Sequence, residues 1–195
     1  MRQKRATLPA SARHDSSHHA ARHLVRLIDQ LGTRKLALYA ARPDELGTLE
    51  AATQLAEHGV TLCYPRVAAK TRTLSFFHVT DPTTLEPGSF GIAEPDAAAK
   101  PVPLDSIELF VVPGLAFDRT GGRLGWGKGH YDATLAHARG TRVGFCFDWQ
   151  IVDQVPRAPH DVLMQLLVTS TGVMEIKNTS TSGPGTDQKQ PILAT

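Results

Sequence analysis

Hydrophobic positions along this chain follow two periods, one typical of helices and the other of short buried strands. Between residues 20 and 31 the apolar positions recur at helical spacing, which predicts an amphipathic helix. The same spacing predicts a helix over 45–58, ended by Gly59, and a further helix over 130–138. Apolar runs predict strands over residues 35–39, 60–64, 74–79, 107–113, 142–147 and 164–169.

This alternation of strands and helices predicts an α/β fold. We expect three α/β/α layers, with a mainly parallel sheet between helices on its two faces. Residues 1–177 are predicted to form one domain. Residues 178–195 are polar and lack apolar periodicity, so we expect a disordered tail with no role in the chemistry.

Length and composition exclude several classes of protein. With 195 residues, 41% hydrophobic and 21% charged, the chain is long and apolar enough to bury a core. No run of 18 apolar residues predicts a membrane span, and no secretory signal is seen, so we expect a cytoplasmic protein. Cys63 and Cys146 lie in strand-like runs and are predicted to be buried free thiols rather than a disulfide or metal framework.

The net charge of +2 hides a basic N-terminal segment. Residues 1–35 hold eight Lys or Arg and two Asp or Glu, whereas the remainder is acidic on balance. Such a segment could be a transit peptide or an arm that binds nucleic acid. Its helical periodicity favours a docked helix with a solvated basic face, and it has no Phe, Tyr or Trp for stacking on bases. We therefore expect no nucleic-acid partner.

The densest chemical signal is a glycine-rich stretch between a predicted strand and a predicted helix. Its five glycines are Gly121, Gly122, Gly125, Gly127 and Gly129. Glycine allows the backbone to approach a ligand closely, so that successive N–H groups can point at one anion. Arg123 and Lys128 add positive charge that phosphate oxygens accept. The stretch therefore predicts a polyphosphate cradle.

The cradle differs from a standard P-loop. Gly122, Gly127 and Lys128 fit the Walker spacing, but Gly129 stands where a Ser or Thr hydroxyl should bind Mg²⁺. A metal ion would need other oxygens, and Asp132 is the nearest carboxylate. The structural alternative is a tight glycine hairpin without a ligand. Arginine, lysine, aspartate and tryptophan in the same stretch argue against it.

These residues resemble the signature of the 5-formyltetrahydrofolate cyclo-ligases, also called 5,10-methenyltetrahydrofolate synthetases. The match includes Pro113-Gly-Leu-Ala-Phe-Asp118 and Arg123-Leu-Gly-Trp-Gly-Lys-Gly-His-Tyr-Asp132. Shorter matches lie at Glu45-Leu-Gly-Thr48, Tyr64-Pro65, Gly91-Ile-Ala-Glu-Pro95, Gln150, Val155-Pro156, His160-Asp161 and Thr169. The resemblance covers residues 5–172 and implies the NagB/RpiA/CoA-transferase-like fold. We expect a monomer.

The resemblance also implies a reaction. ATP and Mg²⁺ would support cyclisation of 5-formyltetrahydrofolate to 5,10-methenyltetrahydrofolate, with release of ADP and phosphate. The formyl oxygen would attack the γ-phosphate, and N10 would then close the ring. Orientation and charge stabilisation would supply the catalysis, so no protein nucleophile is needed.

Roles for single residues are carried over from the family. The ATP loop would comprise Arg123, Leu124, Gly125, Trp126, Gly127, Lys128, Gly129, His130 and Tyr131, with Arg123 and Lys128 catalytic. Folate would contact Glu45 at its pterin end and the stretch Trp126, Gly127, Lys128, Gly129 and His130. Asp132 and Asp161 would hold Mg²⁺.

Each role has a structural alternative. Trp126 could be a loop anchor, Asp161 a turn residue and Glu45 a favourable acid in the first turn of a helix. His130 replaces the first Tyr of the family's usual pair. It could tune the pH dependence or simply substitute for an aromatic ring.

The N-terminus departs from the family pattern. Family members usually carry a Lys and then a Leu-Arg pair that reaches ATP, upstream of a basic run. Residues 2–9 align best with that later run. Either the chain begins late, or Lys4 and Arg5 substitute for the missing contacts.

Two other functions remain open at this point. A sugar-phosphate isomerase or CoA-transferase relative could use the same sheet, with Asp118 or Asp132 as its catalytic carboxylate. A homologue without turnover could bind nucleotide or folate only.

Overall fold

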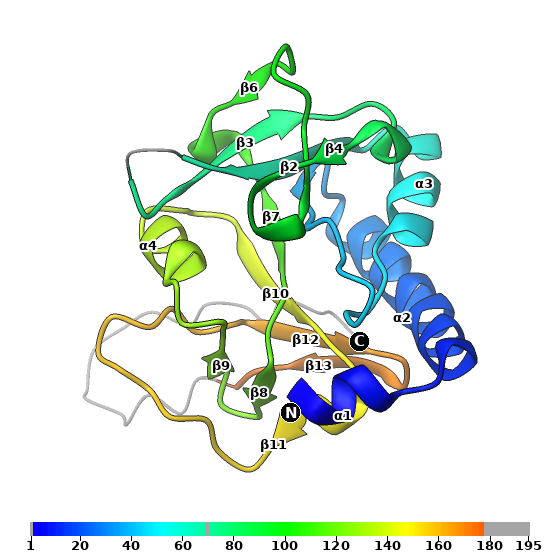
Figure 1. The fold of residues 1–195 in the computed structure, drawn as a ribbon, viewed down its shortest axis with the longest axis vertical. Coiled ribbons are helices and arrows are strands. Elements are labelled where there is room, and N and C mark those ends of the chain that lie inside the picture. Colours follow the sequence, from blue (N-terminus) through cyan, green and yellow to red (C-terminus); the bar gives the residue numbers. More distant parts are fainter. Residues whose placement is uncertain (1, 69–70, 178–195) are drawn as a thin grey trace.

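An eight-stranded sheet forms the centre of the molecule in the computed structural model, which describes residues 2–68 and 71–177 (Figure 1). Its strands are β1 (Lys35–Ala37), β2 (Thr61–Val67), β3 (Leu74–His78), β6 (Pro101–Val102), β7 (Leu109–Val112), β10 (Thr141–Phe145), β12 (Leu166–Thr169) and β13 (Gly172–Glu175). The spatial order is β13-β12-β10-β7-β1-β2-β3-β6. Strands β12 to β2 in this order are parallel, whereas β13, β3 and β6 pair antiparallel at the edges.

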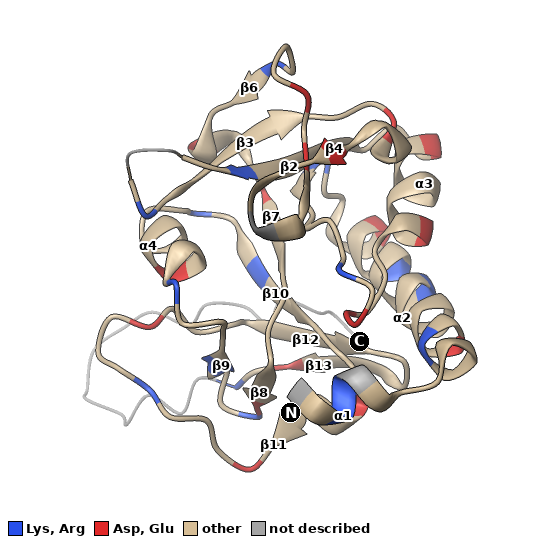
Figure 2. Cartoon of the chain, viewed as in Figure 1, with Lys and Arg blue, Asp and Glu red and all other residues tan. Residues whose placement is uncertain are grey.

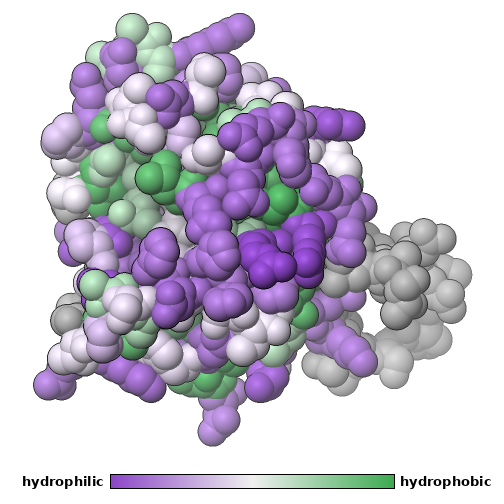
Figure 3. Space-filling view, turned by 90° about the vertical axis from the view of Figure 1, so that its right-hand side faces the viewer, coloured by the Kyte–Doolittle hydropathy of each residue, from purple (hydrophilic) through white to green (hydrophobic). Residues whose placement is uncertain are grey.

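Two helices, α2 (Ala10–Leu31) and α3 (Leu49–Glu57), cover one face of the sheet. The helix α2 buries Leu24 and Ile28 in one cluster with Leu36 of β1 and Val143 of β10. Its outward side carries the charge, and the face that α2 and α3 present to solvent is mostly hydrophilic (Figures 2 and 3). The predicted docked helix with a solvated basic face is thus confirmed.

The opposite face carries a thinner layer. It contains α4 (His130–Leu135) and a small sheet of β11 (Ile151–Val152), β8 (Ala116–Asp118) and β9 (Arg123–Leu124). Leu135 of α4 and Phe117 of β8 pack in one cluster with Phe110 and Cys63 of the main sheet. Successive residues of each strand therefore face different layers, and the predicted three-layer α/β fold is confirmed.

The remaining elements are short. They are α1 (Arg2–Thr7), β4 (Glu86–Pro87), β5 (Ala93–Glu94) and the 3₁₀ turns Pro82–Thr84, Ser89–Gly91, Leu104–Ser106 and Asp148–Gln150. Strands of two or three residues carry no readable period, so the sequence did not predict β8, β9 or β11. The predicted tail at 178–195 lies outside the described residues.

All six predicted strands are present, but two predicted helices are shorter and one is longer. The helix predicted over 20–31 begins at Ala10, and the helix predicted over 130–138 ends at Leu135. The helix predicted over 45–58 begins only at Leu49. The Thr48 hydroxyl donates to the Tyr39 carbonyl at 2.8 Å and holds this stretch against the end of β1 instead. The interpretation of Glu45 as a first-turn helix residue is therefore wrong.

Both cysteines are buried free thiols, as predicted. Burial raises the pKa of Cys63 to about 11, so this thiol stays protonated at neutral pH. Within the described part of the chain, no helix has the length and apolar character needed to cross a bilayer.

The strand order fixes where a ligand site can form. From β1 the chain adds β2 on one side, and it later adds β7, β10 and β12 on the other. Connections leaving the carboxyl ends of β1 and β7 therefore diverge, and such a switch point leaves a crevice where α/β proteins bind ligands. We expect the site at the carboxyl ends of β1 and β7.

Gly144 on β10 tests the packing of the small sheet against the main one. A Cβ at this position would lie 2.6 Å from side-chain atoms of Leu167 and Phe117. Gly144→Ala should lower the free energy of unfolding by about 2 kcal/mol, because the buried neighbours must shift. Urea unfolding monitored by circular dichroism measures this change.

Gly47→Ala is the matched control, since the nearest atom to its added Cβ would be the Ser17 hydroxyl oxygen at 3.3 Å. We expect a smaller loss there, below about 1 kcal/mol, because only the Ser17 side chain has to shift. Equal stability of Gly144→Ala and the wild type would contradict the packing described for β8.

Candidate active site

A cavity of about 280 Å³ opens at the expected switch point. Its walls come from the ends of β1, β2 and β7, from the β4–β5 region and from the glycine-rich stretch. The predicted site residues that line it are Glu45, Arg123, Gly125, Trp126, Lys128, Gly129, His130, Tyr131 and Asp132. Leu124, Gly127 and Asp161 are not among its lining residues. Tyr39 and Arg42 also line it, and sequence reasoning did not identify them.

The glycine-rich stretch begins with a hairpin that is closed by Asp118. This fully buried carboxylate accepts hydrogen bonds from the backbone N–H groups of Thr120 and Gly122, at 2.9 and 3.0 Å. Gly122 must be glycine, because a Cβ there would lie 2.5 Å from the carboxylate and from the Arg157 side chain. The turn between β8 and β9 is therefore built around one anion.

Asp118 also connects this hairpin to a distant segment. Arg157 forms an ion pair with it at 2.5 Å, and the Val155 N–H donates to its other oxygen at 3.1 Å. Burial alone would raise the pKa of Asp118, but these hydrogen bonds and those of the turn outweigh it and hold the pKa well below its usual value. The glycine-rich stretch and the segment that carries Asp161 are thereby held together.

The far end of the stretch leads into α4. Gly129 precedes this helix with a φ of 70°, a left-handed conformation that favours glycine. The hydroxyl of Thr134 accepts from the Leu74 N–H at 2.8 Å, and His130 Nδ1 donates to the Arg72 carbonyl at 2.9 Å. These bonds dock α4 on the β2–β3 hairpin. Since α4 has only six residues, Arg123 and Lys128 supply most of the positive charge.

Arg123 lies beneath the stretch with its side chain 5% exposed. One guanidinium nitrogen donates to Asp132 Oδ2 at 2.7 Å, and another donates to the Pro113 carbonyl at 3.4 Å. The guanidinium carbon lies 5.6 Å from the centre of the Tyr131 ring. Burial raises the pKa of Tyr131 well above its usual value, so the phenol remains neutral.

Asp132 and Asp161 were predicted to hold a metal ion. Asp132 Oδ1 accepts from the Val162 N–H at 3.3 Å, which brings the residue next to Asp161 against Asp132. The carboxylate of Asp161 accepts from the Ala158 N–H at 2.7 Å. No group of three His, Cys, Asp or Glu side chains suited to a metal occurs among the described residues. Two carboxylates fit Mg²⁺, which takes its other ligands from phosphate and water.

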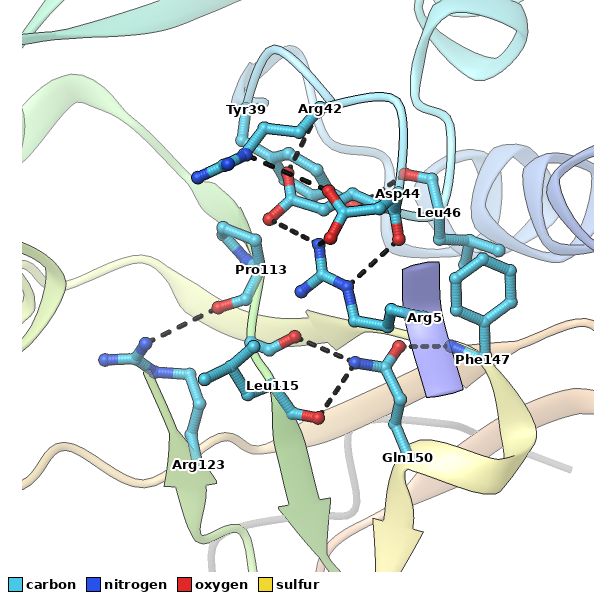
Figure 4. A network of polar contacts seen from close by, with 12 residues as sticks. Arg5, Tyr39, Arg42, Asp44, Leu46, Pro113, Leu115, Arg123, Phe147 and Gln150 are labelled. Atoms are coloured by element: carbon cyan, nitrogen blue, oxygen red, sulfur yellow. Dashed lines mark hydrogen bonds and ion pairs between the residues drawn. The ribbon is translucent and has the colours of Figure 1, made fainter. Parts of the chain in front are cut away.

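The loop between β1 and α3 forms the opposite wall of the cavity (Figure 4). Tyr39 donates its hydroxyl proton to the Leu46 carbonyl at 2.7 Å. The Glu45 N–H donates to the Arg42 carbonyl at 2.9 Å, which closes a turn over residues 42–45. Glu45 Oε2 in return accepts from the Arg42 N–H at 3.1 Å. One oxygen of the Glu45 carboxylate, Oε2, is thus held within its own loop.

A cation from α1 completes this wall. Arg5 forms ion pairs with Asp44 at 3.0 Å and with Glu45 at 3.3 Å, and its Nε donates to the Asp44 carbonyl at 3.0 Å (Figure 4). The ammonium group of Lys4 instead lies 4.9 Å from the Trp149 ring. Local sequence carries no signal for the Arg5 contacts, because the partners are far along the chain.

Trp126 lies where the two walls meet. Its ring centre is 4.7 Å from the guanidinium carbon of Arg42 and 5.4 Å from that of Arg5. The residue is nevertheless 37% exposed. Cation–π contacts thus anchor the ring while part of its surface stays available to a flat ligand.

Gln150 supports the turn after β7 from below. Its side-chain amide donates to the carbonyls of Gly114 and Leu115 at 2.9 and 3.1 Å, and its oxygen accepts from the Phe147 N–H at 2.9 Å (Figure 4). The residue is buried, and the bonds connect the ends of β7 and β10. This gives the Gln150 match a structural role.

Comparison with known proteins agrees on one family. The model of the 5-formyltetrahydrofolate cyclo-ligase family matches residues 1–170. The 5-formyltetrahydrofolate cyclo-ligase of Haemophilus influenzae is 30% identical over 174 residues, which are 86% of this chain and 93% of that protein.

Solved structures agree with this result. The structure of Aquifex aeolicus 5,10-methenyltetrahydrofolate synthetase matches with a TM-score of 0.79 and 28% identity, covering 95% of this chain and 92% of the other. A 5,10-methenyltetrahydrofolate synthetase from Mycoplasma pneumoniae shares the fold, with a TM-score of 0.70 and 22% identity over 86% of this chain and 93% of its own.

The Asp118 network predicts a specific acid sensitivity. Because the folded-state pKa of Asp118 is depressed, its stabilisation is present above the unfolded-state value of about 4 and is lost as the pH falls below it. Asp118→Asn should therefore lower the free energy of unfolding by about 3 kcal/mol at pH 7. Between pH 7 and pH 3 the free energy of unfolding should fall less steeply in this variant than in the wild type. Urea titrations between pH 7 and pH 3 measure both effects.

Asp153→Asn, at an exposed position of the neighbouring segment, is the control and should behave like the wild type. An unchanged acid profile in Asp118→Asn would argue against this role for Asp118.

Proposed function

The chain belongs to the 5-formyltetrahydrofolate cyclo-ligase family, and on this premise we propose that it cyclises 5-formyltetrahydrofolate to 5,10-methenyltetrahydrofolate with consumption of ATP. One observation carries the proposal. The glycine-rich stretch with the adjacent Asp132 and the distant Glu45 line one cavity at the switch point of the sheet.

We assign the ATP phosphates to the glycine-rich side of the cavity. Backbone N–H groups of the stretch from residue 123 to 131 and the charge of Lys128 suit phosphate oxygens. Arg123 reaches the same wall and is already oriented by Asp132 and by the Pro113 carbonyl. Such preorganised cations stabilise the charge that develops during phosphoryl transfer.

The pterin end of the folate is assigned to the Glu45 side. The buried carboxylate of Glu45 is an acceptor for N–H groups, which the pterin ring carries. Trp126 lines the cavity with part of its ring exposed, between the side assigned to ATP and the side assigned to the pterin. The formyl group would then lie near the γ-phosphate.

In this arrangement the chain acts by orientation. The formyl oxygen of the folate attacks the γ-phosphorus and the bond to ADP breaks. N10 then adds to the activated carbon and gives up its proton, and the carbon–oxygen bond to phosphate breaks as phosphate leaves. Holding both substrates in one cavity replaces a bimolecular encounter. Arg123 and Lys128 offset the negative charge at the phosphates, and no protein nucleophile takes part.

We assign Mg²⁺ to Asp132, which lines the cavity, and to Asp161, whose neighbour Val162 bonds to Asp132; these two carboxylates would hold the ion beside the phosphates. When bound, the ion would neutralise phosphate charge. Arg123 shares the Asp132 carboxylate, so this guanidinium also sets how the metal ligand is oriented.

The isomerase or transferase alternative receives less support. Asp118 is fully buried and saturated by hydrogen bonds, so it cannot serve as a base for a substrate in the cavity. The homologue without turnover differs from our proposal only in the formation of product. A monomeric state and a cytoplasmic location stay predictions from the sequence.

Lys128→Ala tests the phosphate assignment. With Mg²⁺, ATP and 5-formyltetrahydrofolate, the wild type should develop the near-ultraviolet absorbance of the methenyl product. Loss of the Lys128 charge should lower kcat by about 100-fold, since one charge-stabilising donor is removed. Lys100→Ala, an exposed lysine outside the cavity wall, is the control and should keep wild-type rates. Full activity in Lys128→Ala would contradict the assignment of the ATP phosphates to the glycine-rich stretch.

Removal of a carboxylate tests the metal assignment. Asp132→Asn and Asp161→Asn should each raise the Mg²⁺ concentration for half-maximal rate by about tenfold, as one charged ligand is lost. The rate is followed against Mg²⁺ concentration at saturating ATP, after treatment with a chelator. Asp153→Asn serves as the control. Identical Mg²⁺ curves for all variants would show that other groups hold the ion.

A further inference from the structure

Arg5 is a buried cation in a six-residue helix. The residue is only 1% exposed, although a charged side chain is costly to bury unless partners compensate it. Its partners are the carboxylates of Asp44 and Glu45, both on the loop between β1 and α3. The proposed catalytic steps give Arg5 no part.

The contacts around Glu45 fix both carboxylate oxygens. Oε1 pairs with Arg5 at 3.3 Å and Oε2 accepts from the Arg42 N–H at 3.1 Å, while the side chain is 8% exposed. The second contact lies within the loop itself and does not depend on α1. Without Arg5 the carboxylate would keep its backbone contact but lose the adjacent positive charge.

Arg5 also reaches the other folate-facing residue. Its guanidinium carbon lies 5.4 Å from the Trp126 ring centre, so one side chain contacts Glu45 and Trp126 together. The planar fork of an arginine suits this task, because Nε donates to the Asp44 carbonyl while Nη2 forms ion pairs with the carboxylates of Asp44 and Glu45. A lysine ammonium would not match both directions.

We propose that Arg5 is a positioning residue for folate, which fixes the Glu45 carboxylate and the Trp126 ring from behind the cavity wall. The inference rests on the proposed function, because it takes Glu45 and Trp126 as the folate contacts. This role differs from the ATP contact that the family resemblance suggests for basic N-terminal residues, since Arg5 forms its ion pairs with Asp44 and Glu45. The expected consequence is a defect in folate affinity that spares ATP.

Calorimetric binding to the full chain separates the two ligands. The titrants are 5-formyltetrahydrofolate and a non-hydrolysable ATP analogue with Mg²⁺. The variants are Arg5→Met, Arg5→Lys, Glu45→Gln and the double variant of Arg5→Met with Glu45→Gln. Arg26→Met, an exposed arginine on α2, is the matched control.

Arg5→Met should weaken the binding of 5-formyltetrahydrofolate at least tenfold and the binding of the ATP analogue less than twofold. Arg5→Lys should recover part of the folate affinity, because it restores the charge without the fork. With Glu45→Gln already present, Arg5→Met should change folate affinity by less than threefold, because the effect passes mainly through Glu45. Thermal unfolding by circular dichroism identifies any variant that fails to fold.

Equal loss of both ligands, or a full tenfold effect of Arg5→Met in the Glu45→Gln background, would overturn the proposal. If Arg5→Met does not fold, the test uses Arg5→Lys instead. Equal weakening of ATP-analogue and folate binding by Arg5→Lys would then overturn the proposal. Failure of the wild type to bind 5-formyltetrahydrofolate would instead reject the proposed function itself.

Discussion

A buried charge must be compensated, and this requirement organises the loops around the cavity. Asp118 with Arg157, Arg5 with Glu45, and Arg123 with Asp132 each connect two segments that are distant in sequence or lie on different elements. Each pair contains at least one side chain that is 5% exposed or less, so loss of a partner would leave a charge in a poorly solvated place. The loops are therefore held by electrostatics where regular hydrogen bonding of strands ends.

The sheet determines where these pairs can act. Because β1 and β7 are neighbours and their connections diverge, the crevice forms at their carboxyl ends. The first connection brings Glu45, and the second brings the glycine-rich stretch. In our account the two substrates approach from these two sides, and the chain contributes placement and charge rather than a nucleophile. Catalysis of this kind depends on rigid support, which the buried pairs and Gln150 supply.

Sequence predicted the fold class and nine of the 19 residues that line the cavity. Strand periodicity and a dense glycine signature are local signals, which single sequences carry. Arg123, Lys128 and Asp132 were identified from the glycine-rich stretch, whereas Glu45 and the folate role of Trp126 came from the resemblance to the family. All five line the cavity. The roles of Arg5 and Asp118 could not be predicted, since each depends on partners more than 30 residues away. The late start of α3 has a similar cause. The apolar pattern predicts a helix from residue 45, but the Thr48 hydroxyl bonds to the Tyr39 carbonyl after β1 and the helix begins only at Leu49.

The central claim is that ATP cleavage and ring closure occur as one coupled reaction in this cavity. Product stoichiometry tests it most directly. Wild-type protein would be incubated with Mg²⁺, ATP and 5-formyltetrahydrofolate, and the methenyl product and phosphate would be quantified together. The account predicts one phosphate released for each methenyl group formed, and no phosphate release without the folate. Phosphate release without methenyl product, or binding of both substrates without either product, would contradict it.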